Sequence, residues 1–170
     1  MDRPQVVIVM GVAGCGKSTI GAMLAARNGG SFYDADDFHP PANIAKMAAG
    51  QPLNDHDRAP WLERLRREVI AAAPAAGLVV LACSVLKKVY REQLGVGTRG
   101  VALIYLKGTA ATLANRLATR PNHYMKAGML ESQLAILEEP PATEGITVGI
   151  ESSREDLVAA IEAALDLHGD

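Results

Sequence analysis

The stretch QVVIVMGVAGCGKSTI, residues 5–20, constrains the fold more than any other part of the chain. It opens with an apolar run from Val6 to Met10 that is too short for an independent helix and rich in β-branched residues. Such a run predicts a strand buried on both faces. Gly11 begins the pattern G-x-x-x-x-G-K-[ST], and apolar residues then recur at helical spacing. The order of strand, glycine-rich loop and helix predicts a phosphate-binding loop.

The residue types of this loop match the chemistry of phosphate binding. Glycines allow backbone conformations that turn successive N–H groups inward around an anion at the start of a helix. Lys17 supplies a charge that can reach the β- and γ-phosphates, and the Ser18 hydroxyl is placed to coordinate Mg²⁺. We therefore predict a nucleoside triphosphate site with Mg²⁺. Its expected residues are Gly11, Val12, Ala13, Gly14, Cys15, Gly16, Lys17, Ser18 and Thr19.

Composition limits the class of protein. The chain has 170 residues, enough for one domain with a substantial core, and 49% of them are apolar. A net charge of −2 provides no basic field for nucleic acid, and no apolar run approaches the ~18 residues that cross a membrane. With only Cys15 and Cys83 present and no signal-peptide core, we expect a cytoplasmic protein without nucleic-acid or membrane partners. Cys15 is either a small filler, which we favour, or a redox-sensitive thiol.

Apolar runs alternate with helical patterns along the rest of the chain. This alternation predicts a single α/β domain over residues 1–170, with a five-stranded parallel sheet covered by helices on both faces in three layers. Polar segments at residues 35–60 and 119–130 would overhang the phosphate loop, and the second resembles a mobile loop, or lid. Strands are expected at 6–10, 31–33, 78–84, 101–106 and 146–150, and helices at 17–28, 42–49, 57–73, 84–94, 110–118, 129–138 and 154–167.

Acidic residues crowd at the end of the second expected strand, in the segment DADDFHPP. Ligand crevices of parallel sheets lie at the carboxyl ends of the strands. Asp34 and Asp36 are two residues apart, so their side chains should point the same way, toward Lys17 and Ser18. Alternatively, one of Asp34, Asp36 and Asp37 only caps the helix that follows.

Several motifs together resemble those of the gluconokinase family of small P-loop carbohydrate kinases, which is related in fold to shikimate and nucleoside monophosphate kinases. They are GVAGCGKST, HPPANIAKMAAGQPLNDHDRAPWL and CSVLKKVYR, and the resemblance extends over nearly the whole chain. It implies a P-loop NTPase fold and ATP-dependent phosphorylation of D-gluconate to 6-phospho-D-gluconate, commonly by a homodimer. Cys15 departs from the family pattern, since similar enzymes often carry serine there.

The resemblance also implies roles for the acidic pair. Related kinases use such a D-x-D pair, so Asp36 is expected to take or orient the proton of the gluconate hydroxyl. Asp34 is expected to contact Mg²⁺ through water, because Mg²⁺ keeps several of its waters in such sites. Lys17 and Asp36 are thus expected catalytic residues, and Ser18 and Asp34 the metal contacts.

A gluconate site needs a cation for the carboxylate and several partners for the hydroxyls. Arg58 can form a bidentate pair with the carboxylate, while Lys87 and Arg91 share one helical face at the end of a strand. His39 is close enough to Asp36 in sequence to join the hydroxyl contacts. The alternatives are that Lys87, Lys88 and Arg91 form a solvated face and that His39 only shapes the turn.

The polar segment near residue 120 carries Arg116, Arg120, His123 and Lys126. Closure of this lid over ATP would bring a guanidinium onto the phosphoryl oxygens, and we assign that catalytic role to Arg120 with Lys126 as second choice. Arg120 is otherwise a surface charge. In similar kinases the arginine at Arg116 stacks on adenine, and residues 150–153 would supply the opposite wall. Trp61 is expected in the core.

The sequence is compatible with two other functions. The same scaffold could phosphorylate another small hydroxy acid such as shikimate, because the fold alone does not select the acceptor. A non-catalytic module could instead use ATP as a switch. Asp36 and the closing lid argue against a switch, which needs no base beside the γ-phosphate.

Overall fold

Five parallel strands form the centre of the molecule, and the computed structural model describes residues 2–119 and 123–168. The strands are β1 (Val6–Met10), β2 (Ser31–Asp34), β3 (Val79–Ala82), β4 (Val101–Lys107) and β5 (Ile146–Gly149). The helices are α1 (Lys17–Arg27), α2 (Pro41–Ala48), α3 (Asp55–Leu65), α4 (Lys88–Gln93), α5 (Ala110–Ala118), α6 (His123–Ile136) and α7 (Arg154–Ala164), with a 3₁₀ turn η1 (Ala35–Phe38) and a π turn η2 (Arg66–Ile70).

The sheet has the order β2-β3-β1-β4-β5, and every neighbouring pair is parallel. β1 lies in the middle, where Val6 pairs with Val79 of β3 and with Val101 of β4. Because the strands are parallel, the segments that follow them gather at one edge of the sheet. The predicted α/β architecture is confirmed, and the phosphate loop lies at the centre of this edge.

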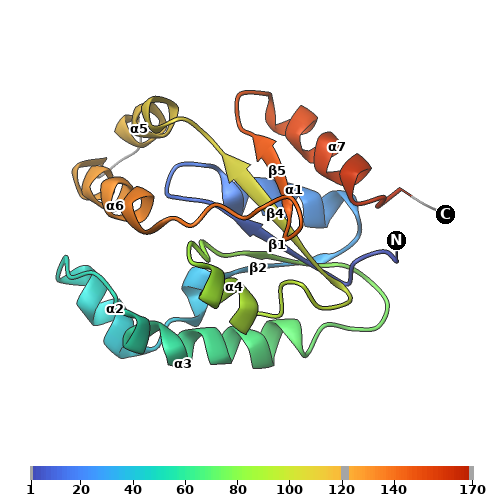
Figure 1. The fold of residues 1–170 in the computed structure, drawn as a ribbon, viewed down its shortest axis with the longest axis horizontal. Helices are drawn as coiled ribbons and strands as arrows, with labels where there is room; N and C mark the ends of the chain where they lie inside the picture. Colours follow the sequence, from blue (N-terminus) through green and yellow to red (C-terminus); the bar gives the residue numbers. More distant parts are fainter. Residues whose placement is uncertain (1, 120–122, 169–170) are drawn as a thin grey trace.

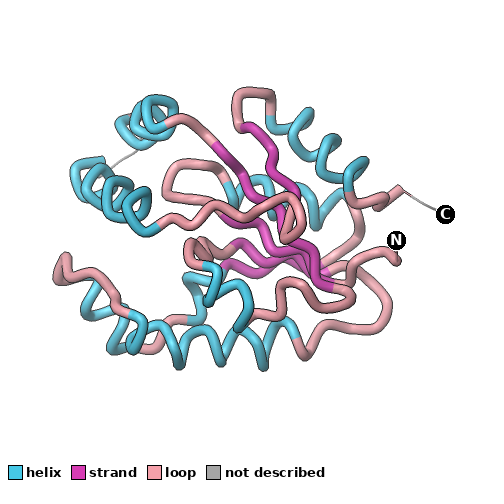
Figure 2. Tube along the Cα trace, in the orientation of Figure 1, coloured by secondary structure: helices cyan, strands magenta, loops and turns pink. Residues whose placement is uncertain are grey.

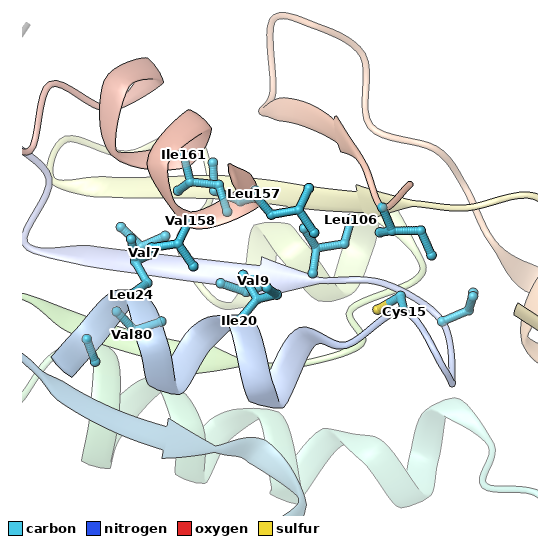
Figure 3. Close-up of a cluster of buried hydrophobic side chains, with 14 of the residues drawn as sticks. Val7, Val9, Cys15, Ile20, Leu24, Val80, Leu106, Leu157, Val158 and Ile161 are labelled. Atoms are coloured by element: carbon cyan, nitrogen blue, oxygen red, sulfur yellow. The ribbon is translucent and has the colours of Figure 1, made fainter. Parts of the chain in front are cut away.

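The alternation of side chains along β1 divides the core between two faces. Val7 and Val9 pack against α1 and α7, and Figure 3 shows them among Ile20, Leu24 and Val158. Val6, Ile8 and Met10 belong to a second buried cluster on the opposite face. The central strand is therefore buried on both sides, as its unbroken apolar run predicts.

Helices α3 and α4 cover the second face of the sheet. Trp61, Leu62 and Leu65 of α3 are each no more than 4% exposed and pack with Tyr90 and the residues of the second cluster. Figure 1 shows α3 and α4 below the sheet and α7 above it, and Figure 2 shows the resulting layers of helix, strand and helix. No helix in the described residues is long and apolar enough to cross a membrane.

Two stretches differ from the sequence expectations. The segment expected as a lid loop is helical from His123, since α6 runs without interruption to Ile136. Residues 123–127, HYMKA, contain no glycine or proline, and the single glycine at position 128 is tolerated inside the helix. The segment after β3 is irregular through Lys87, and α4 begins only at Lys88.

The start of α3 is fixed by a capping box. The Asn54 side chain accepts a hydrogen bond from the Asp57 N–H at 2.8 Å, and the Asp57 carboxylate accepts one from the Asn54 N–H at 2.9 Å. Together these bonds satisfy two donors at the helix start, so α3 begins at Asp55 rather than near Asp57. The cap also orients the first turn, which carries Arg58.

Candidate active site

The phosphate loop, residues 11–16, connects β1 to α1 and depends on glycine for its shape. A Cβ atom at Gly11 would lie 2.5 Å from the Cys15 Sγ atom, so only glycine allows this close approach. Gly16 caps α1 with a left-handed φ of +89°, which turns the backbone into the helix. Cys15 is 1% exposed and packs in the core beneath the loop (Figure 3), which supports its interpretation as a filler.

Asp34 connects the end of β2 to the phosphate loop. The Ser18 hydroxyl donates a hydrogen bond to Asp34 Oδ2 at 2.8 Å, and the N–H of Asp36 donates to Asp34 Oδ1 at 3.0 Å. Asp34 is therefore both the cap of η1 and a neighbour of the loop serine. A role of Asp34 as helix cap and a role as metal contact are therefore compatible.

A magnesium ion fits the Ser18 and Asp34 pair. Both supply oxygen atoms, the ligands that Mg²⁺ prefers. The described residues contain no group of three or more His, Cys, Asp or Glu side chains that could hold a metal. A bound Mg²⁺ would therefore depend on phosphate oxygens and water for its remaining ligands.

Asp36 lies at the same edge, in a charged environment. The residue is exposed to solvent, yet partial burial of its carboxyl group, followed by the negative charge of Asp34, raises its pKa above the ordinary value. The charges of Lys17 and His39 act in the opposite direction on the same pKa. The acidic pair and the loop lysine are thus close enough to influence one another.

His39 is a buried neighbour of Asp36. It is 8% exposed, and its ring stacks on Trp61 with the centroids 4.2 Å apart and an angle of 13° between the planes. Its Nδ1 atom lies 3.2 Å from the Asn43 amide nitrogen, and burial lowers its pKa. Trp61 belongs to the core, as expected, and donates to the carbonyl of Ala35 at 2.7 Å.

Arg58 and Lys87 meet around Tyr90. Arg58 Nη1 lies 3.3 Å from the Tyr90 hydroxyl, and the guanidinium lies over the tyrosine ring at 5.4 Å. Lys87 pairs with Asp55 at 3.2 Å, and the Tyr90 hydroxyl also donates to Asp55. Tyr90 and Asp55 were not among the site residues expected from the sequence, although Tyr90 follows Lys87 at helical spacing. The two predicted cations therefore share one site despite a separation of 29 positions in sequence.

Arg91 has a different role from the one expected. It is 1% exposed, and its Nε atom lies 2.5 Å from Glu144 Oε1. Its Nη1 atom donates to the carbonyls of Val85 and Leu86 at 3.0 and 3.2 Å. The expectation that Arg91 contacts substrate is wrong, because these partners bury its guanidinium. Lys88, in contrast, is exposed and pairs only loosely with Glu92 at 3.8 Å.

A small pocket of about 40 Å³ lies between α3, α6 and the segment after β3. This volume holds little more than one water molecule, so a larger acceptor enters only after side chains move. Arg58 forms part of the pocket wall. The pocket is therefore adjacent to the pair of cations, Arg58 and Lys87. The full lining is Arg58, Trp61, Ser84, Val85, Leu86, Tyr90, Gln133 and Ile136.

A larger pocket of about 340 Å³ borders the phosphate loop at Cys15 and Gly16. This is the size of an ordinary small-ligand site. Arg116 lines it and donates to the carbonyl of Ile150 at 2.7 Å, and Ser152 lines it as well. The residues expected on opposite walls of an adenine site therefore line one pocket. Its lining is Cys15, Gly16, Thr19, Ile20, Arg116, Thr119, Ser152, Arg154 and Leu157.

The remaining lid residues lie beyond what the structure describes. Arg120 falls outside the described residues, and the side chains of His123 and Lys126 are likewise outside them. Their roles stay predictions.

Comparisons with known proteins agree with this geometry. The family model of shikimate kinase matches residues 13–160. A probable gluconokinase of Mus musculus is 42% identical, with 97% of this chain and all of that protein covered. The thermoresistant gluconokinase of Escherichia coli K12 is 40% identical over 92% of this chain and 90% of its own. The crystal structure of a gluconokinase from Sinorhizobium meliloti has a TM-score of 0.85 at 35% identity, covering 98% of this chain and 94% of that one.

A phosphate loop at the centre of a 2-3-1-4-5 parallel sheet, with an acidic pair beside it, defines a small P-loop kinase of the shikimate kinase type. Within that class, identities near 40% extend over almost the full length of the matched proteins. The chain belongs to the gluconokinase family.

Proposed function

We propose that the protein transfers the γ-phosphoryl group of ATP to D-gluconate and releases ADP and 6-phospho-D-gluconate. The observation that carries this proposal is the convergence of three groups at one sheet edge, in a chain about 40% identical to gluconokinases. These groups are the phosphate loop, the pair of Asp34 and Asp36, and the cations around Tyr90.

Residues of the chain would divide the work of nucleotide binding. Arg116 and the carboxyl edge near Ile150 receive adenine in the larger pocket, and Lys17 with the loop N–H groups holds the triphosphate. Ser18 and Asp34 would hold Mg²⁺, which neutralises phosphate charge when it is bound. Arg120 remains our choice for the guanidinium that meets the phosphoryl oxygens.

Asp36 is the proposed base for the acceptor hydroxyl. As the hydroxyl oxygen bonds to the γ-phosphorus, the bond from that phosphorus to the ADP oxygen breaks and the hydroxyl proton passes to the Asp36 carboxylate. Its raised pKa favours proton acceptance, because a more basic carboxylate binds the transferred proton more strongly.

Arg58 and Lys87 are the proposed partners of the gluconate carboxylate. Both lie beside the small pocket, and Arg58 forms part of its wall. A planar guanidinium matches the two oxygens of a carboxylate, whereas Lys87 supplies a point charge. His39 would contribute by supporting Asp36 from its stacked position on Trp61.

A coupled assay of ADP release over a panel of acceptors tests the function. We expect turnover with gluconate and little with shikimate, other sugar acids or nucleoside monophosphates. Faster turnover of a different acceptor would assign the chain to that reaction. ADP release that is independent of every acceptor, or none at all, would favour an ATP-dependent switch. We also propose a homodimer, which sedimentation equilibrium of the same preparation tests.

A further inference from the structure

One N–H group of the phosphate loop is occupied by a side chain from α6. The N–H of Ala13 donates to Gln133 Oε1 at 2.6 Å, across 120 positions of sequence. Ala13 is the third residue of the loop whose N–H groups serve to bind phosphate oxygens. The carboxamide oxygen of Gln133 therefore stands where an oxygen of the nucleotide would be expected.

The same side chain also borders the small pocket. Gln133 lines this pocket together with Arg58, Ser84 and Tyr90. It thus lies between the phosphate loop and the proposed acceptor site. The phosphate that passes between these two sites is the terminal one, so a phosphate oxygen that reaches the N–H of Ala13 from this side belongs to the transferred group.

The backbone around Gln133 is fixed by packing on either side. Leu130 is 5% exposed and belongs to the core, and Leu134 packs against the same cluster. Just beyond α6, the N–H of Glu138 donates to the carbonyl of Leu86 at 2.8 Å, which ties the helix end to the pocket wall. When Gln133 changes its hydrogen-bond partner, its side chain therefore changes rotamer and the helix does not move.

From this placement, and resting on the proposed function, we propose that Gln133 couples the terminal phosphate of ATP to acceptor binding. Without that phosphate its oxygen accepts from the N–H of Ala13. A phosphate oxygen displaces it, because a hydrogen bond to a charged acceptor is stronger than one to a neutral amide. The freed carboxamide turns into the small pocket, where its NH₂ group donates to an oxygen of the acceptor.

Calorimetric titration of gluconate tests this coupling. We expect gluconate to bind wild-type protein about fivefold more tightly with a non-hydrolysable ATP analogue than with ADP, the value of one net hydrogen bond. By thermodynamic reciprocity, gluconate should strengthen binding of the analogue, relative to its effect on ADP binding, by the same factor. Gln133→Met preserves side-chain size, and it should abolish the difference between the two nucleotides.

Ser132→Ala, at the exposed neighbouring position of α6, is the matched control and should retain the difference. A purely structural role for Gln133 would weaken gluconate binding equally with both nucleotides. That result, or a full nucleotide difference in Gln133→Met, would overturn the proposal. If Gln133→Met does not fold, Gln133→Glu provides the test, since its carboxylate keeps the Ala13 bond, has no NH₂ group to donate to the acceptor, and should likewise abolish the difference between the two nucleotides.

The acceptor panel separates this proposal from the proposed function. If the panel selects another acid, the function fails, and the titrations are made with that acid. A nucleotide difference that depends on Gln133 then still supports the coupling. If the panel selects gluconate and the wild type binds it equally with both nucleotides, only the coupling fails. A protein that turns over no acceptor overturns both.

Discussion

At the scale of single residues, the site combines groups that work against one another electrostatically. Asp36 lies near Asp34, whose negative charge adds to the effect of burial and raises the pKa of Asp36. A carboxylate in this environment is a better proton acceptor, but its ionised form is less stable. Function and stability therefore place opposite demands on this residue.

Replacement of Asp36 by asparagine tests its catalytic role. We expect kcat to fall by about 10²–10⁴-fold, the usual contribution of a general base, with ATP binding nearly unchanged. Steady-state kinetics and nucleotide titration measure the two effects, and Asp37→Asn is the matched control. Weaker ATP binding with turnover preserved at saturation would contradict the assignment of Asp36 as base.

The same variant should be more stable than wild type at neutral pH. A raised pKa means that the folded state binds more protons than the unfolded state between pH 3.8 and the folded pKa, so stability falls as pH rises through this window. Asparagine removes that loss. The gain in Tm of Asp36→Asn should accordingly disappear as the pH is lowered toward 3.8, and a gain independent of pH would point to another cause.

Arg58 should contribute to the binding of one substrate only, gluconate. Arg58→Ala removes a charge-assisted hydrogen bond worth about 1.5–3 kcal/mol, so we expect the KM for gluconate to rise about 10–100-fold while the KM for ATP changes little. Arg67→Ala removes an exposed arginine from the turn that continues α3 and serves as control. Equal increases in both KM values would exclude a carboxylate contact.

At the scale of elements, the segment after β3 carries two cations of one sequence motif, Lys87 and Arg91, that have different roles in the structure. Val85 has a φ of +33°, a left-handed conformation that is strained for a β-branched residue. Arg91 donates to its carbonyl and pairs with Glu144, so the buried guanidinium holds this segment in place. The pocket wall therefore depends on an arginine that does not itself line the pocket.

Replacement of Arg91 should lower the stability of the whole domain rather than remove a contact with substrate. Arg91→Met leaves the largely buried Glu144 without its partner, and we expect the free energy of unfolding to fall by about 3–5 kcal/mol. Lys88→Met, at an exposed position of the same helix, should change it by no more than about 0.5 kcal/mol. Denaturant unfolding measures both, and similar values for the two variants would contradict a structural role for Arg91.

At the scale of the whole molecule, the larger pocket borders the phosphate loop at Cys15 and Gly16, and the small pocket is linked to the loop through Gln133, which accepts from the N–H of Ala13. The parallel sheet brings them to one edge because every strand ends there. Nucleotide binding should thus stabilise the entire domain, since the loop connects the central strand to α1 and both contribute to the core.

A saturating Mg²⁺–ATP analogue should raise the melting temperature. At a hundred times its Kd a ligand adds about 2.7 kcal/mol, which for a domain of this size corresponds to about 5–10 °C. Lys17→Ala should lose most of the shift, and chelation of Mg²⁺ should reduce it in wild type. Differential scanning calorimetry measures the change, and an unaltered shift in Lys17→Ala would contradict the role of the loop lysine.

Short stretches of sequence were sufficient to predict the phosphate loop and the parallel α/β sheet. These features follow from contiguous residues, because glycine conformations and unbroken apolar runs are local properties. The contact of Asp34 with Ser18 joins residues 16 positions apart, and Asp36 lies in the 3₁₀ turn η1 rather than on β2, so the spacing of two along a strand does not place the pair. The start of α3 was misplaced by two residues because its capping box involves a polar turn, although Asn54 and Asp57 were a readable signal.

Contacts between distant segments determine which side chains belong to the site and which support it. Arg91 and Lys87 belong to one basic segment, but Glu144, 53 positions away from Arg91, buries one of them while the other remains beside Tyr90. Gln133 carries no sequence signal at all, and its contact with Ala13 exists because α6 packs against the loop. Such roles depend on which distant segments meet, and that is settled by packing of the whole core rather than by any local pattern of residues.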